Sequence, residues 1–120
     1  MLYRAADCNV LYLGDAAHGM VPTLGQGATQ ALEDAANAAA LITQCYSAGD
    51  RDVGRWLEQI EALRAERMRF VMEFSLAATD TMLAGADPVT GTQHKNEAPF
   101  RDGLKALYCD VGLPLDRGKN

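Results

Sequence analysis

The sequence predicts an α/β fragment with one buried parallel-type strand followed by mostly α-helix. Two observations lead to this prediction. The first is a short apolar run from Val10 to Leu13, of the kind that is buried on both faces of a parallel sheet. The second is a series of apolar residues at helical spacing, which begins near Gln26 and continues, with one interruption, to about Ala84.

Length and composition narrow the class of protein. The 120 residues make one small domain or a piece of a larger one, and 48% hydrophobic with 22% charged residues is ordinary for a soluble globular chain. The net charge of −5 argues against a nucleic-acid or membrane-surface partner. No run approaches the ~18 apolar residues of a membrane span. The three cysteines are widely spaced and the N-terminus lacks a signal-peptide pattern, so we expect a cytoplasmic protein.

The predicted strand ends at Gly14 and Asp15, which places a carboxylate just beyond its carboxyl edge. Ligands of open α/β sheets bind at that edge. A single strand cannot satisfy its own backbone groups, and no second strand of comparable quality follows. We therefore expect the rest of the sheet to lie upstream or in a partner, with self-association as the alternative.

A loop through Pro22 leads into Gly25, Gln26 and Gly27, where the first helix begins. A helix N-terminus carries unpaired N–H donors and partial positive charge, which favour an anionic or electron-rich ligand. Glycines let the backbone approach a flat ligand closely. Both signals have simpler readings that stay open at this point. Asp15 is also a common turn or capping residue, and glycine pairs are common in loops.

Alanine-rich helical spacing from about Gln26 to Tyr46 indicates a close approach to a sheet or another helix. A second helical segment runs from about Val53 to Ala84, and a short amphipathic patch lies between Phe100 and Tyr108. The predicted organisation has three parts: residues 1–48 with the strand, acidic turn and first helix, residues 49–86 with the long packing helix or helices, and residues 87–120 as an irregular tail with a short helix.

No residue shows a catalytic pattern, so the catalytic residues stay unknown. His18 has no Ser or Cys nucleophile patterned around it, and a structural histidine that bonds to backbone is favoured over an acid–base group. His94 lies in the polar tail. These histidines and the scattered carboxylates have no metal-ligand spacing, so no metal site is expected. Glu66 and Arg67 are expected to form ion pairs at the surface or between helices.

A resemblance to a known family rests on the string LYLGDAAHGMVPTLGQGATQALEDA, residues 11–35. It closely resembles the second flavin-binding motif of FAD-dependent aromatic hydroxylases, the flavoprotein monooxygenases of the para-hydroxybenzoate hydroxylase type. The match extends over about residues 10–41, and LRAERMRF at residues 63–70 looks like the family's following helix. The resemblance implies that this chain is the C-terminal part of such an enzyme and completes the FAD-binding domain of a larger flavoprotein.

The resemblance also implies roles for individual residues. Gly14 and Asp15 match the pair whose carboxylate binds the ribityl hydroxyls of FAD, and Pro22 matches a proline beside the isoalloxazine ring and the substrate. The helix opening that faces the pyrimidine edge of the flavin is matched by Gly25, Gln26, Gly27, Ala28 and Thr29. Its N-terminus would stabilise the negative charge of the reduced ring. Thr29 departs from the family, which often has Asn there.

The implied activity is an FAD-dependent monooxygenase that uses NAD(P)H as a transient reductant and O2 to hydroxylate an aromatic or related small molecule. The family's GxGxxG unit and its substrate-binding sheet are absent from this sequence. We therefore expect the chain to be incomplete and inactive alone, with little FAD binding of its own. Two alternatives stay open: a related flavoprotein halogenase or reductase, and a non-catalytic truncated helical fragment or interaction module.

Overall fold

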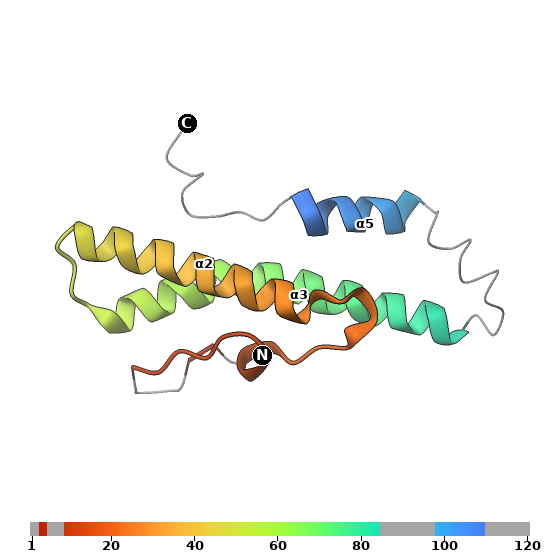
Figure 1. Cartoon of the computed structure of the whole chain (residues 1–120), viewed down its shortest axis with the longest axis horizontal. Helices are drawn as coiled ribbons and strands as arrows, with labels where there is room; N and C mark the ends of the chain where they lie inside the picture. The colour runs from red at the N-terminus through yellow and green to blue at the C-terminus, as the bar shows by residue number, and fades with distance from the viewer. Residues whose placement is uncertain (1–2, 5–8, 85–97, 110–120) are drawn as a thin grey trace.

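A computed structural model describes residues 3–4, 9–84 and 98–109 of the chain. Two long helices, α2 (Gln26–Ser47) and α3 (Val53–Ala84), run side by side in opposite directions and form the body of the molecule (Figure 1). The N-terminal segment, with α1 (Asp15–His18) and the short 3-10 helix η1 (Pro22–Leu24), lies along one side of this pair. The helix α5 (Ala98–Cys109) lies along another side (Figure 1).

Local signals explain where the long helices start and stop. Gly25 precedes α2 in the left-handed conformation, and Gly49 follows it with φ 80°, the usual glycine stop. Asp52 precedes α3, and its carboxylate accepts a hydrogen bond from the backbone N–H of Arg55 at 3.1 Å, as an N-cap does. Both helices form over the spans that their apolar spacing predicts.

The predicted buried strand is wrong. The described residues contain no strand, and the run from Val10 to Leu13 forms only one isolated antiparallel bridge, between Arg4 and Leu11. The N–H of Tyr12 donates to the carbonyl of Tyr3 at 2.7 Å, and Val10 is 44% exposed. A ladder needs a neighbouring strand, and the described residues offer this run no other backbone to pair with. The run instead packs its partly buried side chains against the helices.

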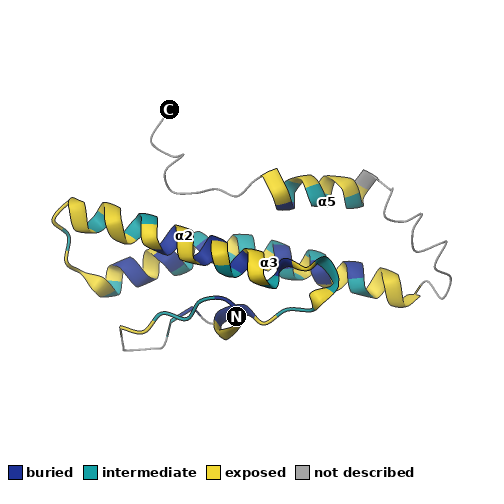
Figure 2. Cartoon of the chain, viewed as in Figure 1, coloured by how far each residue is buried: buried dark blue, intermediate teal, exposed yellow. Residues whose placement is uncertain are grey.

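The apolar core lies on the face of α3 that meets α2 and the N-terminal segment (Figure 2). It has two parts. The first includes a residue of α1 and joins residues from four segments of the chain: Tyr3, Ala17, Met68, Val71 and Leu107. The second lies farther along the helix pair and consists of Ala38, Leu57 and Ile60.

Over residues 26–37, the face of α2 that meets α3 is polar, which reverses the usual arrangement of a surface helix. Its buried polar residues follow helical spacing: Gln26, Gln30, Glu33, Asp34 and Asn37. The apolar residues of the opposite face are exposed, among them Leu32 at 72% and Ile42 at 38%. Of the alanines that were expected to make a close helix contact, Ala38 packs against Leu57 and Ile60 of α3, whereas Ala28, Ala35 and Ala39 are exposed.

The C-terminal helix α5 packs on α3 through a glycine. A Cβ atom at Gly103 would lie 2.6 Å from Cζ of Phe74, so only glycine allows this closeness without a shift of the ring. Phe100 packs against the same ring with centroids 5.4 Å apart. Within the described residues, no helix has the length and apolar character needed to cross a membrane.

Candidate functional site

The predicted site residue Asp15 lies at the start of a tight turn. Gly14 precedes it with φ 59° and ψ −143°, a conformation that is essentially limited to glycine. The carbonyl of Gly14 accepts hydrogen bonds from the N–H groups of Ala17 and His18 at 2.9 and 3.0 Å. These bonds close the four-residue helix α1, and Asp15 is exposed.

The turn lies against the beginning of α2. A Cβ atom at Gly27 would be 3.6 Å from Oδ1 of Asp15, so the carboxylate directly borders the first turn of that helix. The N–H of Gly25 donates to the carbonyl of Pro22 at 2.9 Å, which fixes η1 at the same place. The chain therefore brings Asp15, Pro22, Gly25 and Gly27 together.

The other predicted residues of the helix opening divide between two faces of α2. Ala28 and Thr29 are exposed, whereas Gln26 is buried. The Nε2 group of Gln26 donates to the hydroxyl of Tyr108 on α5 at 3.3 Å. The side chain of Gln26 is thus directed toward the interior of the helix assembly. Only its backbone is available to a ligand at the start of α2.

Behind the turn, the carboxylate of Asp34 contacts both of its ends. Oδ2 accepts a hydrogen bond from the N–H of Gly14 at 2.9 Å and lies 2.5 Å from Nε2 of His18. Oδ1 accepts from Nε of Arg64 at 2.7 Å and from the hydroxyl of Tyr3 at 3.3 Å. Asp34 itself is completely buried.

Arg64 extends this network across the interface between α2 and α3. Its guanidinium donates to Oε2 of Glu33 at 3.0 Å and to Oε1 of Gln30 at 2.8 Å, in addition to Asp34. Arg67 joins from the next turn of α3, with Nη2 at 3.0 Å from Oε1 of Glu33. Arg67 also donates to the backbone carbonyls of residues 106 and 107, at the C-terminal end of α5.

The electrostatics of the network favour an ionised Asp34. Burial opposes ionisation of this carboxyl, but the hydrogen bonds from Gly14, His18 and Arg64 outweigh it, so the pKa of Asp34 lies below its usual value. The pKa of the Tyr3 hydroxyl is raised, first by burial and then by the negative charge of Asp34. Tyr3 therefore acts as a neutral hydrogen-bond donor to the carboxylate.

The expectations for the histidines and for the Glu66–Arg67 pair have different outcomes. His18 is a structural residue, as expected, but it bonds to the side chain of Asp34, and not to backbone. Arg67 forms the expected ion pair between helices, whereas Glu66 is exposed. His94 lies outside the described residues. Within the described ranges, no group of three or more His, Cys, Asp or Glu side chains is arranged to hold a metal ion.

Sequence reasoning missed Asp34 and Arg64 as part of this site. A signal was present, because Arg64 lies in the apolar stripe of α3, four residues from both Ile60 and Met68. A charged residue in that register is either exposed by a bend or buried with partners. The neighbouring pair Glu33 and Asp34 supplied the matching negative charges.

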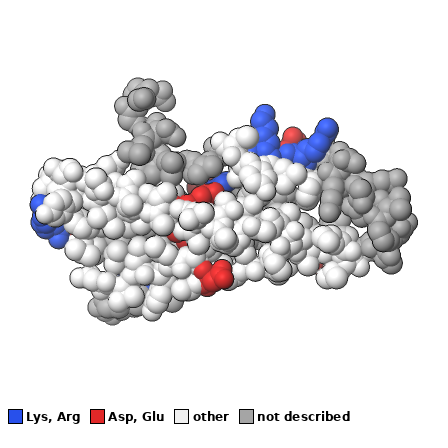
Figure 3. All heavy atoms as spheres, in the orientation of Figure 1, with Lys and Arg blue, Asp and Glu red and all other residues white. Residues whose placement is uncertain are grey.

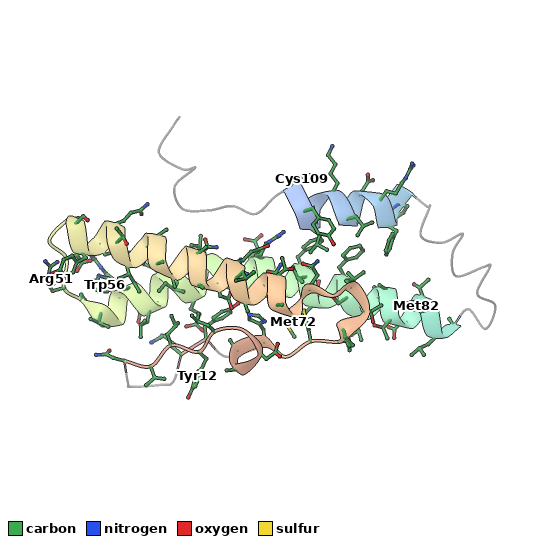
Figure 4. The ribbon with its side chains drawn as sticks, viewed as in Figure 1. Tyr12, Arg51, Trp56, Met72, Met82 and Cys109 are labelled. Atoms are coloured by element: carbon green, nitrogen blue, oxygen red, sulfur yellow. The ribbon has the colours of Figure 1, made fainter. Side chains whose placement is uncertain are left out.

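A cleft of about 420 Å³ lies beside the loop that connects the turn to η1. Its walls are residues 19–21 and one side of α3, and they are mostly apolar. Met72 belongs to this wall and lies midway along the molecule in Figure 4, well separated from Arg51 and Trp56 at the hairpin end. Arg69 and Glu73 also line the cleft.

Comparison with known proteins assigns the chain to a family. A family model described as "FAD binding domain" matches residues 2–75, which is more than half of the chain. The chain belongs to the FAD-binding domain family. The expected kinship with FAD-dependent monooxygenases is confirmed, and FAD is the cofactor of this family.

Several curated relatives are similar to the chain. The FAD-dependent monooxygenase okaB of Penicillium ochrochloron is 38% identical over 78 residues, which cover 65% of this chain and 17% of that protein. The 3-amino-4-hydroxybenzoate 2-monooxygenase PtmB3 of Streptomyces platensis is 52% identical over 58 residues, 48% of this chain and 14% of that protein. The match thus covers about one sixth of the first relative and one seventh of the second. No solved structure matches the chain.

The residues present fit FAD. Asp15 offers an exposed carboxylate that has no hydrogen-bond partner among the described residues, next to a helix start that carries no side chain at Gly27. The adjoining backbone turns are made by Gly14 and Gly25, both with positive φ. The hydroxyl groups of the ribityl chain suit the carboxylate acceptor of Asp15. The flat, electron-rich flavin ring suits the backbone N–H donors at the start of α2.

Proposed function

We propose that this chain supplies the ribityl and isoalloxazine contacts of an FAD-dependent monooxygenase. The observation that carries the proposal is that the exposed carboxylate of Asp15 borders the first turn of α2. A Cβ atom at Gly27 would lie 3.6 Å from Oδ1 of Asp15. Asp15 accepts hydrogen bonds from the ribityl hydroxyls. The N–H groups at the start of α2, over residues 25–29, face the pyrimidine edge, where their partial positive charge favours the reduced ring.

The substrate is an aromatic or related small molecule, and the loop at Pro22 lies beside both the ring and this substrate. FAD supplies the redox chemistry by which NAD(P)H and O2 hydroxylate the substrate. The chain contributes binding and orientation, since no described residue near Asp15 is arranged as a catalytic acid or base. The names of the relatives support monooxygenation. The odd number of widely spaced cysteines in the sequence, with no CxxC pair, supports a cytoplasmic location.

The partner of the chain is the sheet-bearing part of the same flavoprotein, and α2 is the helix that packs on it. The exposed face of α2 carries apolar and small residues along its length: Ala28, Leu32, Ala35, Ala39 and Ile42. Figure 3 shows that few charged side chains interrupt the broad face of the molecule. An apolar helix face of this length is unfavourable in water and favours burial against a sheet.

The test is complementation. The full 120-residue chain is expressed alone and together with PtmB3 from which the matching segment has been removed; we call the second product the complemented complex. The complemented complex is expected to retain FAD, measured by visible flavin absorption, and the chain alone is expected to retain little. A flavin-free complex would contradict the proposed function, and stoichiometric FAD on the chain alone would contradict its dependence on a partner.

Two substitutions separate the cofactor site from the docking face. Asp15→Asn is expected to weaken FAD binding by about 10- to 100-fold while the complex still forms, because a charge-assisted hydrogen bond is lost. Leu32→Glu places a charge on the exposed apolar face, where the native side chain is 72% exposed, and is expected to prevent assembly. Leu76→Glu is the matched control, since Leu76 is 53% exposed but lies on α3.

A further inference from the structure

We propose that Asp34 is a positioning residue for the flavin site: it holds the Asp15 carboxylate in place by fixing both ends of the turn that carries it. This inference rests on the proposed function, because it assumes that Asp15 binds the ribityl chain. It assigns a role to a buried side chain that does not reach the cofactor itself.

The first argument is geometric. Asp15 is the residue after Gly14 and the first of the four residues in α1. One oxygen of Asp34, Oδ2, accepts from the N–H of Gly14 at 2.9 Å and lies 2.5 Å from Nε2 of His18. The same atom therefore binds the residue before Asp15 and the last residue of the turn. A turn this short has few hydrogen bonds of its own, so these two contacts decide its orientation.

The second argument concerns how Asp34 is itself fixed. Its other oxygen, Oδ1, is bound by Nε of Arg64 at 2.7 Å and by the hydroxyl of Tyr3 at 3.3 Å. Asp34 and Arg64 are almost fully buried, at 0% and 1% exposure, so both side chains are immobilised by packing. A guanidinium has rigid donor geometry, and it relates the position of Asp34 to the axis of α3.

The third argument links the turn to the opening of α2. Nη2 of Arg64 donates to Oε1 of Gln30 at 2.8 Å, and Nε2 of Gln30 donates to Oε1 of Gln26 at 3.3 Å. Gln26 is the first residue of α2. One connected set of hydrogen bonds thus orients the two parts of the flavin site, the Asp15 turn and the helix start, relative to each other.

Glu33 provides a matched control within the same network. It is buried and pairs with Arg64 and Arg67, but no hydrogen bond joins it to any residue of the turn. A purely structural role for the network predicts similar effects of substitutions at Glu33 and Asp34. A positioning role predicts that only substitution of Asp34 acts on FAD through Asp15.

The experiment is a double-mutant cycle on FAD affinity in the complemented complex, with Asp15→Asn, Asp34→Asn and the double variant, and with Glu33→Gln as control. Asp34→Asn is expected to weaken FAD binding about tenfold or more, and to add no more than about twofold in the Asp15→Asn background. Glu33→Gln is expected to lower the thermal midpoint, and any loss of FAD affinity is expected to add to that of Asp15→Asn, because Glu33 contacts Gln30 and Arg64 but no residue of the turn.

The other outcomes overturn the inference. Additive effects of the two substitutions, or an equal loss of affinity with Glu33→Gln, would mean that Asp34 acts only through overall stability. If Asp15→Asn leaves FAD affinity unchanged, the proposed role of Asp15 fails and the inference fails with it. If Asp34→Asn does not fold, His18→Asn removes one of the two contacts between Asp34 and the turn, and it is expected to weaken FAD binding only when Asp15 is present.

Discussion

In the half of the helix pair next to the Gly14–His18 turn, α2 and α3 meet through buried charge. Arg64 and Arg67 of α3 contact Glu33 and Asp34 of α2 there. In the half next to the hairpin loop, the same two helices meet through apolar side chains, where Ala38, Leu57 and Ile60 form a separate buried cluster. The same two helices therefore use two kinds of interface along their length.

The two kinds of interface serve different purposes in the two halves. Burial of charge has a large desolvation cost, and well-packed apolar residues would hold two helices together equally well or better. Apolar contacts, however, tolerate small rotations and shifts, whereas hydrogen bonds to a rigid guanidinium do not. We infer that the charged half fixes orientation beside the flavin site and that the apolar half contributes stability.

The largest expected effect is that of Arg64→Met, which removes the central cation but keeps most of the side-chain volume. It leaves the carboxylates of Glu33 and Asp34 buried with fewer partners, so the free energy of unfolding is expected to fall by about 3–5 kcal/mol. Chemical denaturation of the full chain measures this loss. Arg69→Met, at an exposed position on the same helix, is the control, and equal losses in the two variants would contradict the comparison.

A smaller effect is expected for Asp34→Asn, and it depends on pH. Because the pKa of folded Asp34 lies below its unfolded value, the ionised carboxylate stabilises the fold above about pH 4, the unfolded pKa. That stabilisation is lost as the pH falls through the lower, folded pKa. The deficit of Asp34→Asn, about 1–3 kcal/mol near neutral pH, is therefore expected to shrink in acid.

Denaturation midpoints of the wild type and of Asp34→Asn, compared from neutral to acidic pH, test this dependence. Asp80→Asn changes a carboxylate on the exposed surface of α3 and is the control. A deficit of Asp34→Asn that stays constant into acid would mean that the charge of this carboxylate does not stabilise the charged half.

Local features are predicted well from the sequence, whereas the role of the site residues stays a prediction. The Gly14–Asp15 pair and the glycine-flanked start at Gln26 are local signals, and the structure brings them together. The apolar spacing also predicts both long helices. These features depend on residues that are close together in the chain, and local patterns determine them.

Features that depend on distant residues were not predicted. The strand at Val10 to Leu13 requires a neighbouring strand, and an apolar run by itself does not reveal whether one is available. The inward polar face of α2 depends on Arg64, which lies 30 residues after Asp34. Composition and helical spacing identify an amphipathic helix, but a partner decides which of its faces is buried.

The smallest effect is expected for Ile60→Val, which trims one methyl group from the fully buried centre of the apolar half. The free energy of unfolding is expected to fall by about 0.5–1.5 kcal/mol, since a small cavity forms without unpaired polar groups. Chemical denaturation measures this loss, and a flavin titration of the complemented complex is expected to give an unchanged FAD dissociation constant. A dissociation constant that rises in proportion to the lost stability would show that the apolar half also orients the site, and the distinction between the two halves would then fail.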